Sequence, residues 1–386
     1  MLLLLIVIYV VFISLGLPDS LFGVSWPVLH AEFGIPESFA SVYSVIISVC
    51  TGGVSFVSGW LIRKFGTGKV TLVSILITAL GLVGISFSPN IYLMLLFSVI
   101  MGYGAGAIDT GLNNFVSLHY KAQHMNWLHC FWGVGVTVSP MIMAQFLTGE
   151  AGSWRGGYRV VAIMQVVIAL LVLVTLPKWK KSEVAVAAES EEKSDKKLID
   201  ILKTKGMITS IFSLGLYCTM EFLLGTWGAT FIVNTLGLSP DTAAMWVSLY
   251  YGGIMLGRVI SGFVSMKYSD KNLIRGGIAV SFVGMIILLL PLGATSLVGL
   301  LLIGVGFGPV FPSTLHAIPE RFGKTYSADI TGYHMGGAYA IGFGLQLIYG
   351  FVASATTFKI TGFVLVGLCL GLLFCSEKTI RTLKNK

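Results

Sequence analysis

Apolar segments of about twenty residues recur along the whole chain, separated by short stretches rich in glycine, proline and charged residues. An α-helix rises 1.5 Å per residue, so each segment is long enough to cross the roughly 30 Å hydrocarbon core of a bilayer. The first begins at Met1, without a preceding basic stretch or a small-residue cleavage site, so we expect a retained helix. The pattern predicts twelve spans, at residues 1–29, 39–62, 70–88, 91–117, 125–148, 156–176, 206–235, 240–264, 273–292, 295–316, 326–353 and 358–376.

The composition supports a protein that is embedded in the membrane. Apolar residues make up 55% of the chain and charged residues 11%, whereas a soluble domain carries roughly 25% charged residues. This excludes a water-soluble globular protein and predicts a multi-pass protein of the cell membrane. The cysteines lie inside apolar segments with no paired spacing, so they predict neither disulfides nor a metal site; they are Cys50, Cys130, Cys218, Cys369 and Cys375.

The distribution of basic residues predicts the orientation. With twelve spans, both termini share one side, and 21 of the 25 lysines and arginines fall on that side. The positive-inside rule therefore predicts that both termini are cytoplasmic. The net charge of +8 reflects this topology, and we expect no nucleic-acid partner. The longest connection, 178–205, holds eight lysines and six acids, which predicts a flexible cytoplasmic linker between an N-terminal half, 1–177, and a C-terminal half, 206–386.

The two halves are related to each other by an internal sequence repeat. The segment 19–23 is echoed by 221–225, at an offset of 202 residues, and 59–65 is loosely echoed by 262–268. A glycine triplet recurs at the same offset of 202, as Gly102, Gly104 and Gly106 in one half and Gly304, Gly306 and Gly308 in the other. We therefore expect an all-α fold of two pseudo-symmetric six-helix bundles with parallel topology. The glycines should let neighbouring helices approach closely and move against one another.

Few ionisable residues lie deep within the spans. Each costs roughly 2.5–3.5 kcal/mol near the bilayer centre, so it should face a cavity or a partner. Asp19 follows Gly16 and Pro18, which can interrupt a helix and leave backbone groups to line a cavity. Asp19 is therefore a candidate for substrate binding and for reversible protonation. A helix cap or a bond between helices is the alternative.

The fourth and seventh spans carry the other acids. Asp109 and Asn113 are four residues apart and should share a helix face. A carboxylate beside an amide suits a ligand with several hydroxyl groups, although polar contact between helices would also explain the pair. Glu221 stands at the repeat position of Asp19, with Trp227 in the same span. We expect a coupling role for Asp109 and Glu221, and substrate binding by Asp109, Asn113 and Trp227.

Aromatic and basic side chains complete the candidate set. His129 and Trp132 are three residues apart in the fifth span, and His334 stands at the repeat position of Trp132. Their rings could stack on a sugar or an aromatic substrate, or could simply pack between helices. Arg258 lies about two turns above the expected cytoplasmic end of its span, where we expect it to snorkel or to pair with an acid in a loop.

The loop after the second span reads Gly59-Trp-Leu-Ile-Arg63-Lys64-Phe65-Gly66. This loop resembles that of the major facilitator superfamily, and the resemblance of the two halves extends over nearly the whole chain. It departs from the usual pattern at Arg63, where the family has an acid, and at Ser98, where a span-four arginine is common. These differences argue against the drug:proton antiporters and the glucose-type facilitators.

Five further segments resemble the fucose:proton symporter family and its sodium-dependent glucose transporter-like relatives. They are Pro18–Phe22, Ile108–Asn113, Asn126–Gly135, Gly257–Gly262 and Phe311–Thr314. The resemblance implies the major facilitator fold and a sugar transporter in which Asp19 and Asp109 bind sugar hydroxyls and carry the proton. His129 stands where that family has glutamine and Trp132 lies beside it, which together suggest a sugar other than fucose.

These observations predict a secondary active transporter that moves a small polar solute, most simply a sugar, by symport with a proton or sodium ion through alternating access. The alternative is proton-driven efflux or flipping of a drug-like or lipid-like amphipathic compound. The chain has 24 Phe, 14 Met and 8 Trp, enough to line an apolar cavity for such a compound. Catalytic motifs and metal-ligand spacings are lacking outside the spans, so we expect neither an enzyme nor a cofactor beyond the coupling ion. We expect a monomer surrounded by membrane lipid.

Overall fold

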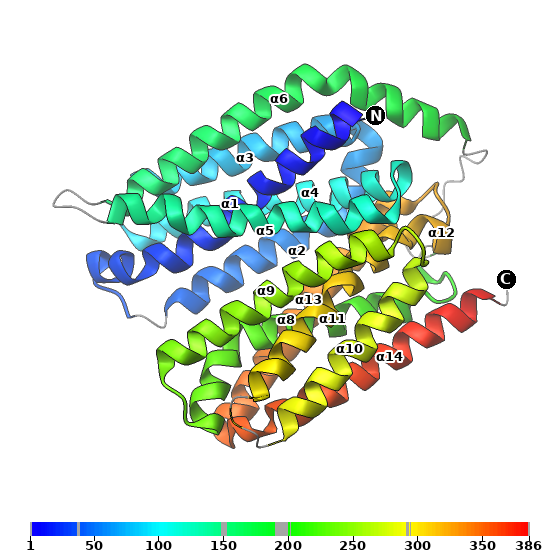
Figure 1. The fold of residues 1–386 in the computed structure, drawn as a ribbon. Helices are drawn as coiled ribbons and strands as arrows, with labels where there is room; N and C mark the ends of the chain where they lie inside the picture. Colours follow the sequence, from blue (N-terminus) through cyan, green and yellow to red (C-terminus); the bar gives the residue numbers. More distant parts are fainter. Residues whose placement is uncertain are drawn as a thin grey trace. The chain divides into compact units, whose positions relative to one another are not determined.

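The computed structural model describes residues 2–36, 39–147, 153–189, 200, 202–290, 293 and 295–384, and its regular elements there are helices (Figure 1). Twelve of the described helices are long and apolar enough to cross a membrane. The predicted number of spans is therefore confirmed.

The helices group into two compact units. Unit 1 comprises Met1–Phe115 and Leu128–Glu192, and unit 2 comprises Val116–Trp127 and Lys193–Lys386. The helices of the first half of the chain are α1 (Leu2–Phe33), α2 (Ala40–Phe65), α3 (Thr67–Phe87), α4 (Ile91–His119), α5 (Ala122–Leu147) and α6 (Trp154–Glu189). Within unit 1, α6 packs against α1 and α3.

The second half of the chain forms the rest of unit 2. Its elements are α8 (Met207–Leu236), α9 (Pro240–Val264), α10 (Asp270–Leu289), α11 (Thr295–His316), α12 (Ile318–Phe322), α13 (Ser327–Ala355), the 3-10 turn η2 (Phe358–Ile360) and α14 (Thr361–Lys384). Here α11 packs between α9 and α10, and α8 packs against α13 and α14. Short α12 connects α11 to α13.

The glycine triplets show that the two units are built alike. A Cβ on Gly102 or Gly106 of α4 would run into α2, and a Cβ on Gly104 would run into α3. Gly304 and Gly308 of α11 meet α9 in the same way, and Gly306 meets α10. Since α2 and α9 are the second helices of their halves and α3 and α10 the third, equivalent glycines contact equivalent neighbours. The predicted close helix contacts are confirmed, and the internal repeat extends to the packing.

The start of the predicted flexible linker is helical instead, which corrects the sequence interpretation for this part. Helix α6 continues to Glu189. Its extension is anchored on unit 1, because Trp179 is buried against Gly68 and Phe115, and the Glu183 carboxylate accepts a 2.5 Å hydrogen bond from the Thr67 amide. The lysine, glutamate and alanine residues of this stretch are also good helix formers. Residues 190–199 and 201 of the linker lie outside the described residues.

The connection between α4 and α5 packs with unit 2 although it interrupts the sequence of unit 1. Ser261 of α9 donates a 2.7 Å hydrogen bond to the Asn126 side-chain oxygen, and the Trp127 ring lies edge-on to Phe263 at 5.4 Å. His316, at the end of α11, lies 3.1 Å from the Tyr120 carbonyl oxygen through Nε2. These contacts explain why Val116–Trp127 groups with α9 and α11.

Candidate functional site

The first part of the candidate site lies where α1 crosses α5 within unit 1. The Trp132 indole nitrogen donates a 2.8 Å hydrogen bond to Asp19 Oδ2. Gly16 and Gly135 make this possible, because a Cβ on either residue would run into the backbone of the other helix. Asp19 is exposed although it lies inside a membrane-spanning helix. Its carboxylate thus accepts a hydrogen bond that connects α1 to α5.

Helix α1 is continuous through Pro18, so the interruption expected beside Asp19 is wrong. Proline lacks an amide hydrogen, so the carbonyl of residue Ser14, one turn earlier, loses its helical partner. The Gln165 side chain of α6 donates a hydrogen bond to this carbonyl oxygen, and Gln165 is buried. A neighbouring helix therefore satisfies the freed backbone group, as membrane helices require.

The second part of the candidate site is a chain of three side chains. The Asn113 amide nitrogen donates a 2.7 Å hydrogen bond to Asp109 Oδ1, and its oxygen lies 3.0 Å from His129 Nε2. All three residues are buried, and the Phe12 ring meets the His129 ring edge-on at 5.4 Å. The shared helix face predicted for Asp109 and Asn113 is confirmed.

Helix α5 connects these two parts. His129 of the Asp109 chain and Trp132 of the Asp19 contact are three residues apart, and side chains at this spacing are neighbours on one helix face. The structure thus brings Asp19, Asp109, Asn113, His129 and Trp132 together around α1, α4 and α5 of unit 1. A change of charge at Asp19 would alter its hydrogen bond to Trp132, and a change at Asp109 would alter the chain of hydrogen bonds that leads to His129. Trp132 and His129 lie on adjacent turns of α5.

The candidates in unit 2 are spread along α8. Ser210, Glu221 and Trp227 span seventeen positions on this helix, which corresponds to about 25 Å at 1.5 Å per residue. His334 is buried against the first of them, with Nε2 2.8 Å from Ser210 Oγ and Nδ1 2.8 Å from the Ile330 carbonyl oxygen. The structure does not gather His334, Glu221 and Trp227 at one place.

Glu221 forms an ion pair that the sequence did not reveal. Its Oε1 lies 4.0 Å from Arg258 Nη2 of α9, and both side chains are largely buried. The expectation that Arg258 snorkels or pairs with a loop acid is therefore wrong. Trp227 packs against Gly350 and Phe358 near the end of α8. The predicted roles of Glu221, Trp227 and His334 remain predictions.

Sequence reasoning missed two residues of unit 1 that shape the site. Gln165 donates a hydrogen bond to the Ser14 carbonyl, which Pro18 leaves without a helical partner. The Phe12 ring packs edge-on against the His129 ring. A buried amide in an otherwise apolar span is a signal that could have identified Gln165. Phe12 is one of many phenylalanines, and its sequence position carries no comparable signal.

The chain belongs to the Major Facilitator Superfamily, whose family model matches residues 8–347. It is therefore a multi-pass membrane transporter of the secondary type and not an enzyme. The resemblance predicted from the sequence is confirmed at this level.

Two curated relatives and one solved structure illustrate the similarity. The glucose/mannose transporter GlcP of Bacillus subtilis is 22% identical, over 97% of this chain and 94% of its own length. The cis,cis-muconate transport protein of Acinetobacter baylyi is 24% identical, over 88% of this chain and 84% of its own length. The fold is similar to that of FucP, the fucose:proton symporter of E. coli, with a TM-score of 0.79 at 13% identity, over 96% of this chain and 98% of that one.

Proposed function

We propose that this transporter takes up a sugar by symport with a cation, through alternating access, with both termini in the cytoplasm and the single chain as the working unit. The observation that carries the proposal is that the Asp19 and Asp109 carboxylates of unit 1 belong to two hydrogen-bonded groups that meet on adjacent turns of α5, at Trp132 and His129. In this arrangement, Asp19 and Asp109 carry the coupling ion and, with Asn113, His129 and Trp132, bind the solute.

The chemistry of these side chains suits a neutral polyol. Carboxylate oxygens accept hydrogen bonds from hydroxyl groups, and the amide and imidazole groups can donate as well as accept. The Trp132 ring offers a flat face for the C–H groups of a sugar. The muconate carried by one relative is an anion, and two carboxylates near the solute would repel a dianion. The names of the glucose/mannose and fucose transporters agree with the choice of a sugar.

A proton is the coupling ion that this geometry favours. An ionised carboxylate only accepts hydrogen bonds, whereas a protonated one can also donate. Proton uptake at Asp19 would change its contact with Trp132, and uptake at Asp109 would change the chain through Asn113 to His129. Glu221 differs, because it forms an ion pair with the cationic Arg258. We therefore assign coupling to the two aspartates of unit 1 first.

The test is uptake by purified protein in proteoliposomes, with a panel of monosaccharides and an imposed pH gradient, an imposed sodium gradient, or neither. We expect one sugar to accumulate when the inside is alkaline, and a protonophore to abolish the accumulation. Accumulation driven by sodium alone would overturn the choice of ion. Export of an amphipathic dye without sugar uptake in any condition would overturn the proposal in favour of efflux.

A further inference from the structure

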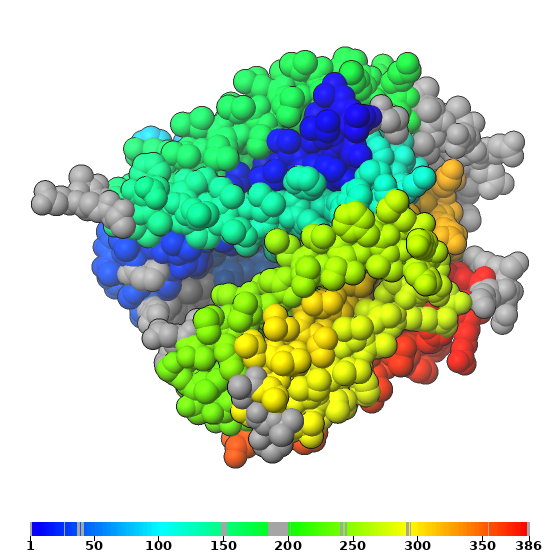
Figure 2. All heavy atoms as spheres, viewed as in Figure 1, coloured from blue at the N-terminus to red at the C-terminus, as the bar shows by residue number. Residues whose placement is uncertain are grey.

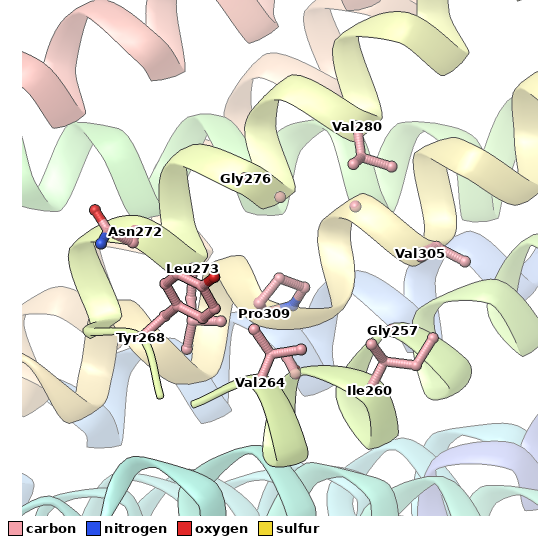
Figure 3. A pocket seen from close by; sticks show the side chains of 13 residues that line it. Gly257, Ile260, Val264, Tyr268, Asn272, Leu273, Gly276, Val280, Val305 and Pro309 are labelled. Atoms are coloured by element: carbon pink, nitrogen blue, oxygen red, sulfur yellow. The ribbon is translucent and has the colours of Figure 1, made fainter. Parts of the chain in front are cut away.

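A groove of about 440 Å³ lies between α9, α10 and α11 of unit 2 (Figure 3). Most of its lining is apolar side chains and glycine backbone. The lining residues are Gly257, Ile260, Ser261, Val264, Tyr268, Asn272, Leu273, Gly276, Gly277, Val280, Val305, Gly306 and Pro309.

The groove opens on an outer surface of the membrane-spanning helices. Ile260 is 45% exposed and Val280 is 37% exposed, and both belong to helices that are long and apolar enough to cross the membrane. Figure 2 shows α9 and α10, in yellow-green to yellow, at the surface of the molecule. Exposed apolar side chains on membrane-spanning helices are suited to contact with lipid, so we expect an occupant of the groove to have an apolar part.

Two adjacent glycines on α10 behave differently in the groove. A Cβ on Gly277 would run into the Gly306 backbone of α11, so the packing of the two helices requires this glycine. A Cβ on Gly276 would meet nothing within 4 Å. Glycine inside a helix is less favourable than alanine, and no contact within the described residues requires a glycine at Gly276. Its absent side chain instead keeps the groove open.

Two of the three polar lining residues lie at one end of the groove, and the third, Ser261, donates a hydrogen bond to Asn126. Tyr268 and Asn272 lie at the turn between α9 and α10, whereas Val280 and Val305 lie at the opposite end (Figure 3). From Asn272 to Val280 the groove follows eight residues of helix, or about 12 Å. Lys267 precedes Tyr268 and Lys271 precedes Asn272 in the sequence. Two acids lie near these lysines: Asp270 is engaged by His316 at 2.6 Å, and Glu377, which also interacts with Lys271, is paired with Arg275.

We propose that this groove is a binding site for an anionic phospholipid, with one acyl chain lying between Gly276 and Val305 and the phosphate at the turn that carries Lys267 and Lys271. The groove fits the acyl chain through its length, its apolar lining and the open space at Gly276. The tyrosine hydroxyl, the asparagine amide and the two ammonium groups fit the anionic headgroup, because lysines near the membrane surface attract anionic lipids.

The test is native mass spectrometry of the purified full chain with dioleoyl phosphatidylglycerol or dioleoyl phosphatidylcholine added to the detergent. We expect the wild type to retain one more phosphatidylglycerol than Gly276→Leu, whose side chain fills the groove. The matched control is Gly367→Leu on α14, where a Cβ also meets nothing within 4 Å but which does not line the groove. This control should bind lipid as the wild type does.

The headgroup is tested by Lys267→Gln combined with Lys271→Gln, against Lys64→Gln combined with Lys69→Gln in unit 1. The Lys267→Gln and Lys271→Gln variant should lose the preference for phosphatidylglycerol over phosphatidylcholine. The Lys64→Gln and Lys69→Gln variant should keep that preference. Equal lipid retention by the wild type and Gly276→Leu would overturn the site. Equal retention of both lipids by the wild type would overturn the anionic ligand. A dimer that Gly276→Leu dissociates would show that a second copy occupies the groove instead.

Discussion

The Trp132 indole nitrogen and the Asp19 carboxylate are joined by a 2.8 Å hydrogen bond that connects α5 to α1. Hydrogen bonds to a charged partner are stronger than those between neutral groups. Because one partner can gain a proton, the contact between these helices depends on the state of Asp19. This makes the pair the simplest physical connection between a proton and a movement of helices in unit 1.

Replacing Trp132 with phenylalanine should therefore impair transport while the protein still folds. Phenylalanine keeps an aromatic ring at this position but lacks the indole N–H group, so the hydrogen bond to Asp19 is lost. We expect the rate of sugar uptake at low concentration to fall by about tenfold, which corresponds to the loss of one hydrogen bond to a charged group. Uptake by Trp132→Phe proteoliposomes measures this. Trp60→Phe, on an exposed part of α2, is the control and should transport normally; equal uptake by the two variants would show that the indole donor is dispensable.

His129 should control both stability and sugar preference. His129→Leu leaves the buried Asn113 oxygen without the imidazole partner, and an unsatisfied buried acceptor costs about 1–3 kcal/mol. We expect a lower melting temperature for His129→Leu and a nearly unchanged one for His129→Gln, whose amide can still donate. The order of preferred sugars should change in His129→Gln. If His129→Leu melted like the wild type, the bond to Asn113 would contribute no stability.

The Glu221–Arg258 pair should show strong energetic coupling. Removal of one partner of a buried ion pair leaves an uncompensated charge, at a cost of about 3–5 kcal/mol, whereas removal of both can be nearly neutral. We expect Arg258→Met to be less stable than the double variant Arg258→Met with Glu221→Gln. Thermal unfolding of the wild type, both single variants and the double variant gives the coupling. Additive effects would mean that the two charges do not interact.

The paired glycines predict equal sensitivity in the two units. Gly104→Ala and Gly306→Ala each place a methyl group against a neighbouring helix, and overpacking costs about 1–3 kcal/mol. We expect both variants to melt at a lower temperature than the wild type. Gly367→Ala, whose Cβ meets open space, should not lower it. Destabilisation by Gly104→Ala alone would contradict the equivalence of the two glycines in the repeat.

Much of the architecture follows from the sequence, because hydrophobicity and glycine spacing act locally. The number of spans, the glycine contacts of α4 and α11, and the Asp109–Asn113 bond were all predictable from spacing along a helix. The family membership followed from short motifs at the expected spans.

Contacts between distant parts of the chain were less accessible. The partner of the Ser14 carbonyl in α1 is Gln165, which lies 151 residues away in the sequence. Likewise, Arg258 finds its partner in Glu221 of another helix, and the α6 extension is held by a contact with Thr67. Such pairings depend on tertiary packing, and no local pattern in the sequence encodes them.

The proposed transport mechanism requires Asp19 and Asp109 to couple sugar movement to a proton. The most direct measurement compares uphill uptake, driven by a pH gradient, with sugar counterflow in proteoliposomes of the wild type, Asp19→Asn and Asp109→Asn. Asparagine keeps the size and some hydrogen bonding of aspartate but cannot ionise. We predict that each variant loses uphill uptake and retains counterflow. Normal uphill uptake by either variant would remove that aspartate from the coupling mechanism, and normal uptake by both would contradict the account.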